Sequence, residues 1–202
     1  MKLELPTINT KLLLKSFLFS LAALVGINVI FRLIGFAISN SFAYFVEDPF
    51  YIVLILFEGI GNNLYLIVQD LIQIIYDLGV AIDTGGYVFD EVALLYIIIG
   101  YLLAPIIAGI FAGYFSETKF EALGGLFLAF LVCWLAWTIF YAVSLFGINL
   151  GTLASEYETV ANYLAPTTSE SVWAIFFAFI VMIVTVLTFA FVPLVIKKEY
   201  AY

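Results

Sequence analysis

The chain has 202 residues, of which 65% are hydrophobic and only 11% are charged, and its mean hydropathy is +1.18. Soluble domains carry about 25% charged residues, so this composition excludes a water-soluble fold and predicts a membrane protein whose solvent is lipid. The sequence contains no histidine, which excludes haem with an axial histidine, the common copper sites, most catalytic zinc sites and acid–base catalysis by imidazole.

Motifs that carry other kinds of chemistry are also missing from the sequence. It has no Walker motif, no dinucleotide-binding fingerprint, no HExxH, no CxxC and no GxSxG. The single cysteine, Cys133, lies in an apolar run, so we expect it to pack as a small hydrophobic residue. We therefore expect no enzymatic activity, no cofactor and no bound metal, and the absence of a basic patch argues against a nucleic-acid partner.

The first apolar run predicts a membrane span over residues 12–39. Lysines that precede an apolar run also mark a signal peptide, but this run is long enough to cross the bilayer, so we expect a retained span. Arg32 is the only charge well inside it and lies within reach of the outer interface. We expect an ion pair between Arg32 and Glu58; the alternative is a gating or substrate-binding arginine.

Residues 49–79 predict a long helix between the first and second spans. Asp48 before a proline gives a helix start, Gly59 and Gly61 allow a bend, and Gly79 is expected to end the helix. The first part is apolar all round, and the rest is amphipathic with a polar arc of about 140°. A straight helix of this length would be about 46 Å long. It therefore lies on the outer interface, dips into the membrane or, in a five-span arrangement, crosses it.

The polar arc of this helix holds most of the candidate functional residues. They are Glu58, Asn62, Asn63, Gln69, Asp70, Gln73 and Asp77. Ionisable side chains at membrane depth are costly and often mark ion paths or proton relays. Three interpretations stay open: a cation pathway, a face that meets water at the interface, or a contact with another subunit.

The second and third spans, expected at residues 91–115 and 120–146, are joined by a very short connection. Thr118 and Glu121 in this connection have the spacing of a capping box. Small residues, which let helix backbones approach closely in lipid, recur along both spans. These packing residues are Gly100, Ala104, Ala108, Ala112, Gly109, Gly113, Gly124 and Gly125. We therefore expect these two spans to form a tight antiparallel hairpin.

A second polar segment, residues 147–171, precedes the fourth span, which is expected at residues 172–196. Apolar residues in this segment recur at helical spacing from Leu153 to Leu164, which predicts a short helix on the membrane surface. Thr167 and Glu170 then form a capping box at the start of the last span.

The lysines predict the orientation of the chain. They lie at the N-terminus, in the connection between the second and third spans, and at the C-terminus: Lys2, Lys11, Lys15, Lys119, Lys197 and Lys198. With four spans all three places fall on one side, which the positive-inside rule assigns to the cytoplasm. Residues 40–90 and 147–171, which contain acidic residues and no lysine or arginine, then face outward. We expect a multi-pass plasma-membrane protein with both termini in the cytoplasm.

The sequence thus predicts one all-α membrane domain, residues 1–202, with four transmembrane helices and an extracytoplasmic amphipathic helix, interfacial or re-entrant, between the first two. The missing catalytic motifs and the packing-rich helix faces favour a non-catalytic scaffold or accessory subunit of a larger membrane assembly. Its expected partners are the lipid bilayer and other membrane subunits or copies of itself. The alternative is a small oligomeric transporter or channel that uses the polar face of helix 49–79.

Overall fold

The computed structural model describes residues 8–39, 56, 64–84, 89–145 and 171–196, and the regular secondary structure within these ranges is entirely α-helical. The helices are α1 (Thr10–Ser39), α4 (Leu64–Thr84), α5 (Phe89–Tyr114), α6 (Lys119–Leu145), α8 (Ser171–Phe189) and α9 (Phe191–Ile196). Four stretches are long and apolar enough to cross a membrane: Thr10–Ser39, Glu91–Tyr114, Lys119–Ile139 and Ala178–Ile196. These stretches confirm the four expected apolar helices and indicate a multi-pass membrane protein.

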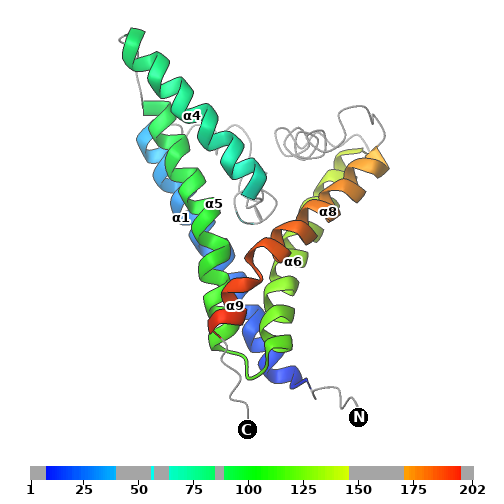
Figure 1. Ribbon diagram of the computed structural model, residues 1–202. Helices are drawn as coiled ribbons and strands as arrows, with labels where there is room; N and C mark the ends of the chain where they lie inside the picture. The colour runs from blue at the N-terminus through cyan, green and yellow to red at the C-terminus, as the bar shows by residue number, and fades with distance from the viewer. Residues whose placement is uncertain (1–7, 40–55, 57–63, 85–88, 146–170, 197–202) are drawn as a thin grey trace.

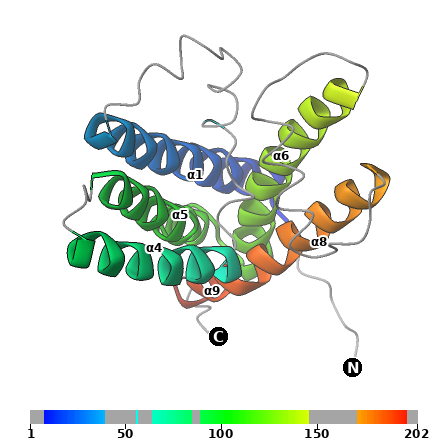
Figure 2. The same cartoon turned by 90° about the horizontal axis from the view of Figure 1, so that it is seen from above.

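The helices form two arms that meet at one end and diverge at the other (Figure 1). One arm contains α1, α4 and α5, and the other contains α6 and α8. The short helix α9 and the turn between α5 and α6 lie where the arms meet. Seen from above, α5 lies between α1 and α4 (Figure 2). Helix α5 is therefore the centre of the first arm.

Helices α1 and α5 pack antiparallel, because stripes of small and polar residues let their backbones approach. Every fourth residue of α1 from Ser16 to Phe36 is buried. On α5, Ala104, Ala108 and Ala112 are fully buried at the same spacing. This is the small-residue packing pattern of membrane helices.

The small residues of α5 lie against α1 rather than against α6, where we expected them. Ser20 Oγ donates a hydrogen bond to the Ala108 carbonyl and Ser16 Oγ donates one to the Ala112 carbonyl, both 3.1 Å long. A Cβ added to Gly100 would overlap Phe31 of α1. The pattern shows that another backbone comes close, but it does not identify which backbone, so the partner we inferred for this stripe was wrong.

Two further glycines of α5 contact α9. A Cβ at Gly109 would lie 2.9 Å from Val192, and one at Gly113 would lie 2.9 Å from Ile196. Helix α6 also uses its glycines against α1: a Cβ at Gly124 would lie 2.8 Å from Leu13, and one at Gly125 would overlap Ser16. These glycines bring α1, α5, α6 and α9 together at the end where the arms meet.

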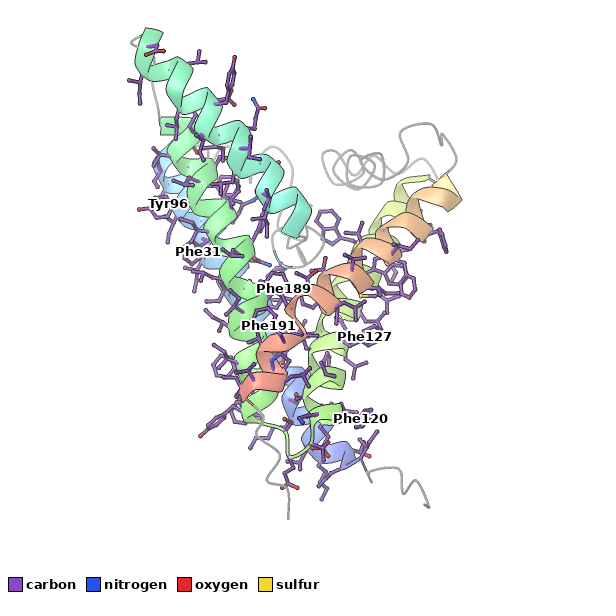
Figure 3. All side chains as sticks on the ribbon, in the orientation of Figure 1. Phe31, Tyr96, Phe120, Phe127, Phe189 and Phe191 are labelled. Atoms are coloured by element: carbon purple, nitrogen blue, oxygen red, sulfur yellow. The ribbon has the colours of Figure 1, made fainter. Side chains whose placement is uncertain are left out.

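The fourth span is interrupted at Ala190, where we expected one continuous helix. Pro193 lacks a backbone N–H, and its ring clashes with the carbonyl four residues earlier, that of Phe189, which is the last residue of α8. The Ala190 N–H instead donates to the Leu187 carbonyl at 3.3 Å. Phe189 and Phe191 lie on either side of this break (Figure 3).

Helix α4 packs beside the first half of α5. Its buried residues Ile67 and Ile74 form an apolar cluster with Ile98, and Leu78, Leu95 and Tyr101 pack around it. The expectation that Gly79 ends the helix was wrong, because α4 continues through it to Thr84. A glycine inside a helix costs about 1 kcal/mol relative to alanine, but Ile74 and Leu78 in the turn before it pack in the cluster with α5. Residues 49–55, 57–63 and the helix expected around Leu153–Leu164 lie outside the described residues.

Candidate functional site

Arg32 lies buried between α1 and α5, with only 7% of its surface exposed. Its Nη1 donates a hydrogen bond to Tyr101 Oη at 3.2 Å, and its guanidinium carbon lies 5.7 Å from the centre of the Phe36 ring. The side chain therefore packs within the helix pair rather than extending along the lipid-facing surface. The partner predicted from sequence, Glu58, lies outside the described residues, so that ion pair stays a prediction.

Arg32 ends a polar stripe that the sequence analysis recognised only in part. Ser16, Ser20 and Asn28 are buried on the same stripe of α1. The two serines donate hydrogen bonds to carbonyls of α5, so they join the two helices directly. Their spacing from Asn28 and Arg32, in multiples of four residues, was the signal that could have identified them.

The described part of the predicted polar arc lies along one flank of α4. Gln73 Nε2 donates to both carboxylate oxygens of Asp77, at 3.0 and 3.1 Å. Asp70 lies two turns before Asp77 on the same flank, and its partial burial raises the pKa of its carboxyl group above the ordinary value. Glu58, Asn62 and Asn63 lie outside the described residues, and Gln69 belongs to α4 with a side chain outside them.

The side of α4 opposite its contact with α5 carries large exposed side chains. Ile72 and Tyr76 on this side are 65% and 67% exposed, and Ile75, on the flank away from Asp77, is 62% exposed. Ile72 and Tyr76 are one helical turn apart and therefore neighbours on this side. We call Ile72 and Tyr76, with Gln73 and Asp77 at their edge, the outer face of α4.

A separate polar cluster fixes the end of the molecule where the two arms meet. Glu121 is buried and accepts hydrogen bonds from the backbone N–H groups of Asn9, Glu117 and Thr118, at 2.8, 2.8 and 3.1 Å. The Glu121 N–H in turn donates to Thr118 Oγ1 at 3.2 Å, which confirms the predicted capping box. Through Asn9, this box also holds the start of α1. The cluster is structural.

In the described part of the chain, no three His, Cys, Asp or Glu side chains lie close enough together to hold a metal ion. No protein-family model, curated protein or solved structure matches the sequence or the fold. The outer face of α4 combines exposed apolar side chains with the Gln73–Asp77 pair.

Proposed function

We propose that the protein is a non-catalytic scaffold or accessory subunit of a larger membrane protein assembly. The observation that supports this most is the position of the outer face of α4. Helix α4 packs beside α5, which is one of the four apolar spans, so its flanks extend along that span. A helix lying in the plane of the interface can turn one flank to water and the other to lipid. A helix that extends beside a span cannot separate the two in this way.

The two flanks of α4 differ in polarity and therefore suit different surroundings. Lipid suits Ile72 and Ile75 but leaves the Gln73–Asp77 pair with no polar partner beyond itself. Water suits the pair but not the isoleucines. A protein surface satisfies both, because interfaces combine an apolar centre with a polar rim. This favours a re-entrant α4 that contacts another subunit.

We further infer that the assembly lies in the plasma membrane, with both termini of this chain in the cytoplasm and α4 on the outer side. The one-sided distribution of the lysines supports this orientation. Lys11 and Lys119 lie at the end of the molecule where the arms meet, and the end of α4 at Thr84 lies at the opposite end (Figure 1).

Native purification tests the subunit function. The tagged full-length chain would be extracted from its own membrane in a mild detergent, and the proteins that migrate with it would be identified by mass spectrometry. We expect at least one other membrane protein at a constant ratio to this chain, and an unrelated tagged four-span protein should not recover it. Recovery of this chain alone, as monomer or oligomer, would overturn the proposal.

A small oligomeric transporter or channel is the second candidate, and Asp70 is the observation that favours it. Its carboxyl group is partly buried, its pKa is raised, and α4 carries it beside the first half of α5. Such carboxyl groups are common in cation and proton pathways. Purified protein in liposomes would then conduct a monovalent cation or protons, and Asp70→Asn would abolish the flux. The subunit function predicts no flux in either protein.

A further inference from the structure

The outer face of α4 indicates what kind of partner fits it. We propose that Ile72 and Tyr76 dock a membrane helix of another protein, and that this helix carries a lysine or arginine opposite Asp77. The inference rests on the proposed subunit function and specifies its contact surface.

Tyr76 supplies the anchor of this surface. Its side chain is 67% exposed and lies one turn from Ile72, so an aromatic ring stands next to a branched aliphatic side chain. Tyrosine combines a large apolar area with a polar hydroxyl group at low conformational cost, and it is enriched among the residues that dominate binding energy. A helix laid against this face would cover both side chains and lie beside Gln73 and Asp77.

The charge of α4 indicates which partner fits this face: a second copy of the chain, a lipid surface or a helix of another protein. The helix contains Asp70, Asp77 and Asp83 and no lysine or arginine, and the sequence has no basic residue between Arg32 and Lys119. A second copy of α4 would place aspartate against aspartate, and anionic lipid headgroups would also be repelled. Helices that bind lipid surfaces are instead rich in lysine and arginine. A basic partner helix complements this face.

Gln73 holds Asp77 ready for such a contact. Its amide nitrogen donates to both carboxylate oxygens across one helical turn. An ionised carboxylate has about four acceptor sites, so sites remain for a guanidinium or ammonium group from outside. A charge-assisted hydrogen bond of this kind is roughly twice as strong as a neutral one.

The spacing of the aspartates argues for a side chain rather than a metal ion. Asp70 and Asp77 are seven residues apart, which is about 10 Å along the helix axis. Calcium and magnesium bind their oxygen ligands at about 2.0–2.6 Å, so a single ion cannot reach both carboxylates. Basic side chains two turns apart on a facing helix would match this spacing.

Site-specific photocrosslinking of the full-length chain in its native membrane tests the contact directly. A photoreactive benzophenone amino acid would replace Ile72 or Tyr76, with similarly exposed Leu187 of α8 and Tyr114 of α5 as controls. We expect adducts from positions 72 and 76 to one helix of the protein that co-purifies with this chain, with a lysine or arginine within one turn of the modified residue. The two controls should give at least about tenfold less of this adduct. Adducts only to lipid, to a second copy, to another segment of the same chain or to a helix without a basic residue would each overturn the inference.

Charge reversal supplies the matched biochemical test. Asp77→Lys should reduce recovery of the co-purifying protein at least about tenfold, whereas Glu117→Lys, an exposed acid in the α5–α6 turn, should leave it unchanged. Tyr76→Ala against Tyr114→Ala repeats the comparison without a change of charge. If a partner co-purifies equally with all four variants, the subunit function stands and this contact is wrong. If no partner co-purifies with the unmodified chain, both are wrong.

Discussion

Arg32 of α1 and Tyr101 of α5 are joined by a 3.2 Å hydrogen bond from Nη1 to the phenolic oxygen. Tyr101 also packs against the cluster that Ile67 and Ile74 of α4 form with Ile98. The pair therefore connects all three helices of the first arm. It also places the positive charge of Arg32 against an acceptor inside the protein, where lipid could offer none.

Tyr101→Phe removes the acceptor and keeps the ring. We expect the variant to lose about 1.5–3 kcal/mol in free energy of unfolding, the range for a hydrogen bond to a charged group, because it leaves a buried guanidinium with one partner fewer. Tyr96→Phe, on the more exposed side of α5, is the matched control and should lose little. Unfolding in a graded mixture of mild and denaturing detergents measures both. Equal losses for the two variants would show that Tyr101 contributes only packing.

The apolar helices could be predicted because hydropathy acts over whole segments. The apolar runs and the capping box of Thr118 and Glu121 are local patterns, and the structure contains them. The contacts of the small residues could not be predicted, because Ala108 has the same pattern whether it faces α1 or α6. The break at Ala190 needed attention to Pro193, whose ring acts on a carbonyl in the preceding turn.

The candidate site was predictable only in its residue types. Asp70, Gln73 and Asp77 do share one flank of α4, as helical periodicity requires. Periodicity could not show that α4 lies beside α5, the contact on which the proposed re-entrant position rests. Sequence reasoning also overlooked Tyr101, because a tyrosine within an apolar span gives no sign that it accepts a hydrogen bond from another helix.

The glycine contacts predict opposite effects for the same substitution. Gly125→Ala should lose about 1–3 kcal/mol in stability, because the new Cβ would overlap Ser16 and lie 3.0 Å from the Phe17 nitrogen, so α6 must move away from α1. Gly26→Ala, where no atom lies within 4 Å of the new Cβ, should gain up to about 1 kcal/mol from higher helix propensity. Thermal unfolding of the two variants in one detergent compares them. A loss for Gly26→Ala equal to that for Gly125→Ala would contradict the packing described here.

Glu121→Ala should release the start of α1 from the α5–α6 turn. Three backbone N–H groups lose their acceptor, including that of Asn9, 112 residues away in sequence. An unsatisfied buried donor costs about 1–3 kcal/mol, but Asn9 and Glu117 are exposed, so water can replace Glu121 as their acceptor and the loss of stability should be at the low end of this range. Hydrogen–deuterium exchange should show faster exchange at the first residues of α1, while exposed Glu117→Ala leaves that exchange unchanged. Unchanged protection of Asn9 in Glu121→Ala would disprove the link.

Cysteine accessibility tests the orientation. In a background that lacks the buried Cys133, Asp83→Cys at the end of α4 and Glu117→Cys in the α5–α6 turn place one exposed thiol at each end of the first arm. If the lysine-bearing end is cytoplasmic, an impermeant thiol reagent should label position 83 in intact cells and position 117 only after permeabilisation. The reverse pattern would invert the topology, and labelling of both positions in intact cells would contradict it.

Asp70 should make stability depend on pH. Burial raises the pKa of its carboxyl group in the folded protein above the ordinary value of 3.8, so the folded state keeps this proton at pH values where the unfolded state has released it. Stability must therefore fall as pH rises from about the ordinary value through the raised one, because the folded state binds more protons there. Asp70→Asn removes the titrating group. Its stability should match that of the unmodified protein at the acidic end, exceed it increasingly as pH rises, and keep a constant advantage once the folded carboxyl has ionised. Thermal unfolding of both proteins across this range in one detergent measures the difference, and an advantage that is independent of pH would show that the carboxylate carries no desolvation cost in the folded protein.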